Sequence, residues 1–213
     1  MEIRVGTRPS PLALKQAQEA ISALKSIYPD AVYATHRIKT TGDTDKTTPI
    51  SEVEDSDFFT KELDDALLDG EIDIAVHSSK DLPAGLREGL AVWIETGSIS
   101  RRDALISKNG LKFTKLPEMS KIGSSSRRRK AQVKALRDDL MIVDIRGTIE
   151  ERIALVDSGK IDALIVAEAA LIRLGLESRI AEILPNEYFE THPKQGRLSL
   201  VVRKGTWQKV KYI

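Results

Sequence analysis

Short runs rich in Ile, Val and Leu alternate along the chain with longer stretches whose apolar residues recur every three or four positions. The run 72–76 is typical of a strand buried on both faces of a parallel sheet, and Leu14, Ala17 and Ile21 share one helix face. Strands alternating with helices indicate an α/β fold with largely parallel sheets. The predicted strands are 3–5, 31–40, 72–76, 104–107, 142–145, 163–166 and 198–202. One predicted helix begins at Pro11, and the others cover 58–68, 126–136, 148–158 and 168–174.

Single residues mark the ends of some of these elements, and other segments indicate boundaries between lobes. Ser10 is a suitable N-cap for a helix whose first residue is Pro11, and Gly70 is a suitable stop for the helix before it. A soft boundary falls at 96–101, and a return crossing is expected near 185–193. Two lobes joined by two crossovers would have a cleft between them, which is a usual place for a ligand.

Composition excludes several classes of protein. The 213 residues include 33 Lys and Arg against 32 Asp and Glu, so no bulk charge indicates a nucleic-acid coat. No stretch approaches the ~18 apolar residues of a membrane span, and the first residues lack a secretion signal, so we expect a cytoplasmic protein. The absence of Cys excludes thiolate chemistry, and three scattered His argue against a metal site.

Basic residues follow several of the predicted strands. Arg8 follows 3–5, Arg146 follows 142–145, and the turn Gly123–Ser126 leads into the run Arg127–Lys130. In open α/β sheets, ligands bind outside the carboxyl ends of the strands, at helix N-termini, so we expect an anionic ligand. Planar guanidinium groups bind carboxylates bidentately, which favours a ligand with several carboxylates. Phosphate remains an alternative, although no Gly-Lys-Thr/Ser motif indicates a nucleotide.

The run Arg127–Lys130 is the strongest single signal for an anion site. Four cations in the first turn of a helix lie at the positive end of its dipole, which costs about 0.3–1 kcal/mol each. A bound polyanion would reverse that sign, and Ser124 and Ser126 add hydrogen-bond donors. A solvated charge run is the alternative. Nucleic-acid binding is disfavoured because no aromatic residues are interleaved with the basic ones.

Asp81, in the segment His77–Pro83, is the obvious acidic group among these cations. A carboxylate surrounded by positive charge should stay ionised at neutral pH. It could balance a developing cation or accept hydrogen bonds from ligand N–H groups. The alternative is an ordinary capping Asp before Leu82 and Pro83.

Ordered motifs along nearly the whole chain resemble the porphobilinogen deaminase (hydroxymethylbilane synthase) family. The resemblance implies two lobes like those of type-2 periplasmic binding proteins, with mostly parallel five-stranded sheets, helices on both faces and two crossovers. It places lobe 1 at 1–98 plus 188–213 and lobe 2 at 99–187, and leaves no room for the family's third domain. The matching motifs are Arg8–Leu14, Phe59–Leu63, His77–Pro83, Arg102–Ala104, Gly123–Arg129, Arg146–Thr148 with Arg152, Arg173–Ile180 and Gln195–Gly196.

The resemblance also implies an activity and a set of site residues. Members join porphobilinogen units head to tail with release of ammonia, a transferase reaction of tetrapyrrole (heme) biosynthesis. By position, Asp81 is the catalytic carboxylate, which holds pyrrole N–H groups and stabilises the cationic azafulvene. The residues expected to bind porphobilinogen, linear pyrrole chains or the cofactor are Arg8, Ser10, Gln16, Lys61, Ser78, Lys80, Ser124, Ser126, Arg128, Arg129, Arg146, Gly147, Arg152, Arg173 and Gln195.

The chain departs from the family pattern in three places. The family's dipyrromethane cofactor is held by a cysteine, and this chain has none, so we expect a non-covalent cofactor, one supplied in trans, or none. Loop 52–57 is acidic instead of Gly/Lys-rich, and Ala170 and Arg127 replace the usual residues of their motifs. A partner chain could supply a third domain; otherwise we expect a monomer. The alternative function is a non-catalytic homologue that binds pyrroles or polycarboxylates.

Overall fold

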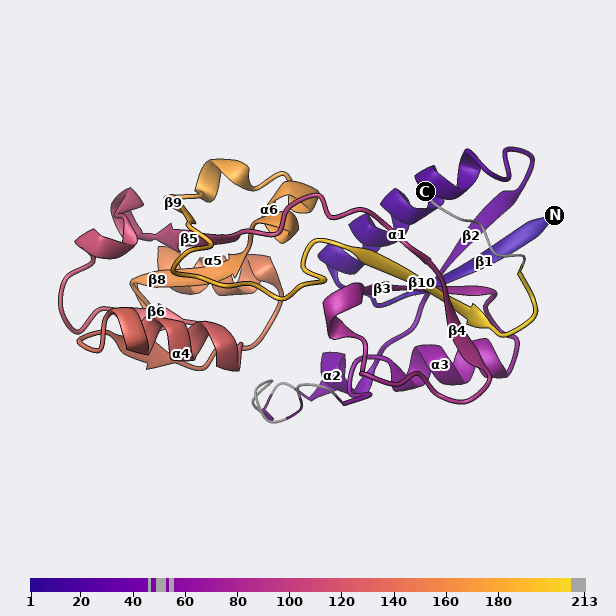
Figure 1. The fold of residues 1–213 in the computed structure, drawn as a ribbon, viewed down its shortest axis with the longest axis horizontal. Coiled ribbons are helices and arrows are strands. Elements are labelled where there is room, and N and C mark those ends of the chain that lie inside the picture. Colours follow the sequence, from indigo (N-terminus) through magenta and orange to yellow (C-terminus); the bar gives the residue numbers. More distant parts are fainter. Residues whose placement is uncertain (46, 49–52, 54–55, 208–213) are drawn as a thin grey trace. The chain divides into compact units, whose positions relative to one another are not determined.

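The chain folds into two compact units, each built around its own sheet (Figure 1). The structure is a computed structural model that describes residues 1–45, 47–48, 53 and 56–207. Among the residues described, unit 1 contains 1–45, 56–99 and 196–207, and unit 2 contains 47–48, 53 and 100–195. The chain therefore enters unit 2 after Ile99 and returns at Gly196. The limits of lobe 1 (1–98 plus 188–213) and lobe 2 (99–187) remain predictions from the sequence.

Unit 1 has a mixed five-stranded sheet in the order β2-β1-β3-β10-β4. β1 pairs in parallel with both β2 and β3, whereas β10 is antiparallel to both β3 and β4. Four strands thus run in one direction and β10 alone is reversed, which confirms a mostly parallel sheet. The strands are β1 (Glu2–Thr7), β2 (Val32–Arg37), β3 (Ile74–Ser78), β4 (Leu90–Glu95) and β10 (Leu198–Arg203).

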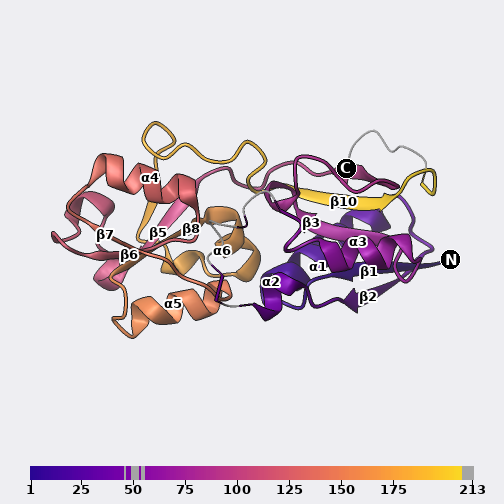
Figure 2. The same cartoon turned by 90° about the horizontal axis from the view of Figure 1, so that it is seen from below.

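Helices cover both faces of this sheet, as predicted (Figure 2). Helix α1 (Pro11–Lys25) buries Ala20 and Leu24 against one face, and α3 (Lys61–Leu68) buries Leu63 and Leu67 against the other. The predicted N-cap is confirmed: the Ser10 hydroxyl accepts a hydrogen bond from the backbone N–H of Ala13. Two short elements, α2 (Thr41–Thr44) and the 3-10 helix η2 (Ser79–Asp81), lie beside the strand ends.

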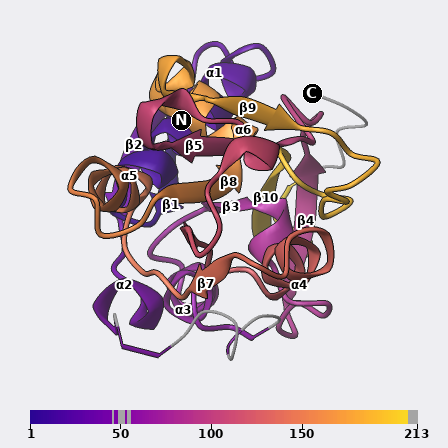
Figure 3. The same ribbon diagram turned by 90° about the vertical axis from the view of Figure 1, so that its left-hand side faces the viewer.

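Unit 2 repeats the arrangement, in the order β7-β6-β8-β5-β9 (Figure 3). β6 is parallel to β7 and β8, and β5 is antiparallel to β8 and β9, so β5 is the reversed strand. Helix α4 packs on one face through Val133, and α5 and α6 pack on the other through Ile153 and Leu171. The elements are β5 (Asp103–Ser107), β6 (Lys121–Gly123), α4 (Arg127–Leu136), β7 (Met141–Val143), α5 (Ile149–Asp157), β8 (Ala163–Ala167), α6 (Glu168–Leu174) and β9 (Glu182–Leu184), with 3-10 turns η3 (Lys108–Gly110), η4 (Phe113–Lys115) and η5 (Glu177–Arg179).

The sequence pattern did not predict β4, β6, β9 or α2. β6 and β9 have three residues each and α2 has four, so none is long enough to show a period. The predicted strand 142–145 ends early, because β7 stops at Val143. Within the described part of the chain, no helix has the length and apolar character needed to cross a membrane.

Candidate functional site

In unit 1 the candidate site lies where β1 and β3 end. The two strands are parallel neighbours, so their carboxyl ends meet at the same edge of the sheet. Arg8 directly follows β1, and Lys80 and Asp81 lie in the turn η2 that directly follows β3. Asp81 is exposed and Lys80 is half-buried. The sequence therefore brings together one carboxylate and two cations at the end expected for a ligand.

His77 lies in β3 beneath this group and is 6% exposed. Burial lowers the pKa of its imidazole to about 4; the charge of Asp81 raises that pKa and the charge of Arg8 lowers it. Both charges are therefore close enough to act on the same ring. The imidazole is neutral at pH 7, and its Nε2 has no hydrogen-bond partner among the described residues.

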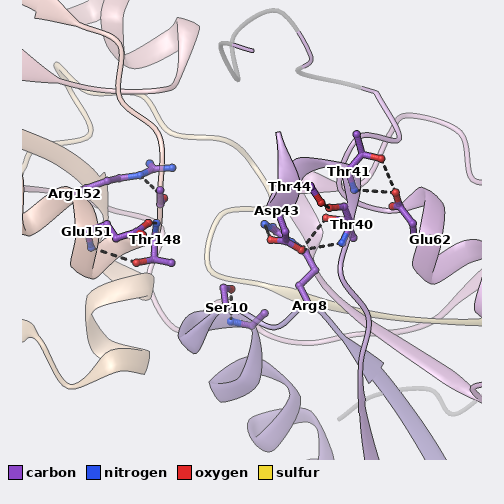
Figure 4. A network of polar contacts seen from close by, with 12 residues as sticks. Arg8, Ser10, Thr40, Thr41, Asp43, Thr44, Glu62, Thr148, Glu151 and Arg152 are labelled. Carbon is purple, nitrogen blue, oxygen red and sulfur yellow. Dashed lines mark hydrogen bonds and ion pairs between the residues drawn. The ribbon is translucent and has the colours of Figure 1, made fainter. Parts of the chain in front are cut away.

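Arg8 is already partnered by a carboxylate of the protein, Asp43 (Figure 4). Its Nε lies 3.1 Å from Asp43 Oδ1, and its Nη2 donates to the same oxygen. The guanidinium also stacks over the ring of Phe59, 4.4 Å from the centroid. Burial would raise the pKa of Asp43, but the hydrogen bond and charge of Arg8, helped by Thr40, outweigh burial and lower it. Asp43 is not among the residues predicted from the sequence.

Helix α2 presents Asp43 to Arg8 and is held at both of its sides. Asp43 Oδ2 accepts from the backbone N–H and the hydroxyl of Thr40, at 3.1 and 2.9 Å, in a capping box. Glu62 Oε1 accepts from the backbone N–H and the hydroxyl of Thr41, at 2.8 and 2.5 Å (Figure 4). A Cβ on Gly42 would lie 2.1 Å from the Phe59 ring, so this position needs glycine.

The other predicted residues of unit 1 also have partners within the protein. Gln16 Nε2 donates to Ser78 Oγ at 2.9 Å, which ties α1 to the end of β3. The hydroxyl of Ser10 caps α1. Lys61 pairs with Asp65 at 2.8 Å, four residues along α3. The structure brings Gln16 and Ser78 together at the strand end, while Ser10 and Lys61 serve their own helices.

In unit 2, the turn after β6 is built from three serines. The backbone N–H of Ser124 donates to the carbonyl of Val143 at 3.1 Å, and the Ser124 hydroxyl accepts from the N–H of Ser126 at 3.3 Å. Ser125 Oγ donates to the Ile145 carbonyl at 2.7 Å. Ser126 occupies the N-cap position of α4, but its hydroxyl makes no cap hydrogen bond. The turn thus holds the first residues of α4 at the end of the sheet.

Arg129 and Gln195, both predicted to bind ligand, form a buried network with Asp103. Arg129 donates to both Asp103 oxygens, at 2.8 and 2.7 Å, and its Nη2 lies 3.3 Å from Gln195 Oε1. Gln195 Nε2 donates to Asp103 Oδ1 at 2.8 Å and to the carbonyls of Arg101 and Arg102, at 3.0 Å each. The Arg129 side chain is 12% exposed and that of Asp103 is 2% exposed. The network was not predicted from the sequence.

Arg128, one residue earlier, has the opposite character. It is exposed at the N-terminal turn of α4, and its side chain makes no ion pair or hydrogen bond with any residue that the structure describes. The helix dipole is unfavourable for this cation and favourable for an anion placed beside it. Arg128 is therefore the member of the basic run that is best suited to meet an anionic ligand.

The remaining predicted residues of unit 2 surround the helices α5 and α6. Gly147 has a φ of +104°, and a Cβ there would lie 2.4 Å from Glu151 Oε2, so glycine is required. Thr148 and Glu151 form a capping box, and Arg152 Nε donates to the Gly147 carbonyl at 2.9 Å (Figure 4). Arg146 directly precedes this turn, and Arg173 lies in the last turn of α6.

Each unit by itself thus contributes a different chemistry. Unit 1 offers an exposed carboxylate beside Lys80, and unit 2 offers arginines next to the N-termini of α4 and α5. Those donors suit carboxylate groups. No group of three or more His, Asp or Glu among the described residues could hold a metal ion.

The fold defines a class, that of two-unit α/β proteins like periplasmic binding proteins. A reduced form of OxyR from N. meningitidis has a TM-score of 0.53 at 15% identity, covering 97% of this chain and 88% of that one. A candidate methionine-binding lipoprotein from Bacillus subtilis has a TM-score of 0.53 at 14% identity, covering 96% and 84%. At these identities the likeness concerns the fold alone.

Sequence relatives narrow the class to one family. Residues 3–211 match the family described as porphobilinogen deaminase, dipyromethane cofactor binding domain. The porphobilinogen deaminase of Chlorobaculum parvum is 43% identical over 202 residues, and that of Natranaerobius thermophilus is 42% identical over 204. These matches cover 95% of this chain and 65% and 66% of the relatives, slightly less than two thirds of their length. The chain belongs to the porphobilinogen deaminase family.

Proposed function

We propose that the chain forms the two substrate-binding units of a porphobilinogen deaminase, a transferase of the hydroxymethylbilane synthase type. It would join porphobilinogen units head to tail and release ammonia in tetrapyrrole (heme) biosynthesis. The observation that carries the proposal is the position of Asp81. This exposed carboxylate lies next to Lys80 in η2, which directly follows β3; its charge raises the pKa of the buried His77, whereas the charge of Arg8 lowers that pKa.

Asp81 supplies the electrostatic part of the reaction. When the ammonia of porphobilinogen leaves, the pyrrole becomes a cationic azafulvene, and a fixed carboxylate stabilises that charge as it develops. Such preorganised groups change rates by about 10²–10³-fold. Asp81 also accepts hydrogen bonds from pyrrole N–H groups, which orients the ring before the new carbon–carbon bond forms.

The arginines of unit 2 hold the acid side chains of the pyrroles. Arg128 is exposed at the start of α4 and has no protein carboxylate as partner among the described residues, unlike Arg129. We propose Arg128, Arg146, Arg152 and Arg173 as carboxylate ligands. Arg129 and Gln195 would instead keep the first turn of α4 in place through Asp103.

The arginines of this chain suit the family's dipyrromethane cofactor, but the usual covalent attachment of that cofactor is missing. Its carboxylates match the arginines, whereas the chain has no cysteine that could form a thioether. When bound, the group supplies a pyrrole carbon on which the chain grows. We propose that Arg128 and its neighbours hold the group through its carboxylates, without a covalent bond to this chain.

Incubation of the chain with porphobilinogen tests the function. We expect release of ammonia together with hydroxymethylbilane, and native mass spectrometry should show an added mass that matches a bound pyrrole chain and is lost on denaturation. A bound pyrrole without ammonia release would select the binding-only alternative. The absence of both pyrrole binding and ammonia release would contradict the proposal.

A further inference from the structure

Arg8 has lost most of its freedom before any ligand arrives. Asp43 occupies the edge formed by Nε and Nη2, and Phe59 covers one face of the guanidinium plane. The side chain is still 26% exposed. Its third nitrogen, Nη1, makes no hydrogen bond with any described residue and is not buried. Arg8 is therefore fixed in one orientation, with the edge formed by Nη1 and the second N–H of Nη2 left for a ligand.

Asp43 is itself rigidly supported, so it can act as an anchor. Both of its oxygens are used, Oδ1 by Arg8 and Oδ2 by Thr40, and its side chain is 11% exposed. The contacts of Glu62 with Thr41 fix α2 to α3 from the other side. A displacement of Asp43 would have to break these hydrogen bonds and move the Phe59 ring away from Gly42.

We infer that Asp43 is a positioning residue, which turns Arg8 so that the free N–H groups of its Nη1–Nη2 edge meet one acid group of the pyrrole ligand. This inference rests on the proposed function. It predicts that Arg8 binds the acid group through the Nη1–Nη2 edge, because Asp43 occupies the edge formed by Nε and Nη2. Because the acid group lies away from the reacting carbon, Arg8 should contribute mainly to binding, equally in the ground and transition states.

The chain contains a matched control for this ion pair. Arg4 and Asp73 form the same kind of bidentate pair in unit 1: Arg4 Nε and Nη2 lie 3.0 and 2.7 Å from the Asp73 oxygens. Arg4 lies within β1, four residues before Arg8, and Asp73 directly precedes β3, so this pair is away from the strand ends that carry Asp81. Asp73→Asn removes an equivalent interaction without touching the site.

The test compares Asp43→Asn with Asp73→Asn in two assays on the whole chain. In steady-state turnover of porphobilinogen, Asp43→Asn should raise KM about 10-fold or more, with kcat changed much less, since small misplacements of a binding group cost up to about 100-fold. Asp73→Asn should leave KM within about twofold. Asp43→Glu should recover part of the loss, because it restores the charge.

The second assay does not depend on activity. In the ligand-free protein, the Nε–H proton of Arg8 is followed by NMR, and its signal is assigned with Arg8→Lys. This proton should exchange slowly with solvent in wild type and in Asp73→Asn, and rapidly in Asp43→Asn. An unchanged Arg8 signal in Asp43→Asn, or equal KM values for both asparagine variants, would overturn the inference. If wild type converts no porphobilinogen, the proposed function fails, and the exchange comparison alone decides the role of Asp43.

Discussion

Acid should weaken unit 1 through His77. Burial lowers the pKa of His77 to about 4, from its ordinary value of 6.5, so the folded state binds fewer protons than the unfolded chain between these values. The stability from keeping this ring neutral is fully present above pH 6.5. It is lost as the pH falls from 6.5 through 4, by about 2 kcal/mol at pH 5 and about 3 kcal/mol in total.

A second buried group, Asp64, opposes this effect. Asp64 is 2% exposed in α3, and burial raises the pKa of its carboxyl to about 6 from 3.8. Its folded state therefore takes up a proton first, and unit 1 gains about 1 kcal/mol as the pH falls from 7 to 5. Wild type should lose only about 0.5 kcal/mol over this range, since the two contributions largely cancel.

The contributions of His77 and Asp64 to the pH dependence of stability are separated by comparing Asp64→Asn with Asp64→Asn/His77→Gln. Urea unfolding followed by tryptophan fluorescence reports on unit 1, because Trp93 and Trp207 are the only tryptophans of the sequence and both belong to that unit. From pH 7 to 5 the single variant should lose about 2 kcal/mol more than the double variant. Equal losses in the two variants would refute the reasoning, since His77 would then not titrate differently in the folded state.

Three further predictions follow from single contacts. Asp64→Asn should raise the free energy of unfolding of unit 1 by about 1–3 kcal/mol at pH 8, measured by urea unfolding, because it removes a buried carboxylate that is ionised there; a decrease would contradict this. Asp103→Ala leaves the buried Arg129 without its partner and should cost about 3–5 kcal/mol, whereas an effect below about 1 kcal/mol by circular dichroism would argue against the network. Gly42→Ala must displace the Phe59 ring and should cost about 1–3 kcal/mol, while the same change at the open Gly85 should cost less than about 1 kcal/mol; similar values for both would count against the packing at α2.

Much of the fold follows from the pattern of apolar residues. Strand β8 is buried throughout and wholly apolar, and β3 begins with the buried apolar run Ile74–Val76, so both runs stand out from their neighbours. The ends of α1 and α5 follow from Ser10 and Thr148, whose side chains cap the backbone. The reversed direction of β10 could not be read locally, because pairing partners lie more than a hundred residues away.

The candidate site was harder to predict than the fold. The sequence located the cations but not their partners, since Arg8 meets Asp43 across 35 residues and Arg129 meets Asp103 across 26. A guanidinium binds a protein carboxylate by the same geometry as a ligand carboxylate, so residue type alone does not separate the two roles. Carboxylates of the chain pair with Arg4, Arg8, Arg102 and Arg129 among the described residues.

The turnover rate of Asp81→Asn tests the central proposal most directly. The exchange removes the negative charge and keeps the size of the side chain, and Glu88→Gln, at another exposed acid of unit 1, serves as the control. Ammonia release from porphobilinogen should fall about 10²–10³-fold in Asp81→Asn and stay close to the wild-type rate in Glu88→Gln. Release at the wild-type rate in Asp81→Asn would contradict the role of this carboxylate.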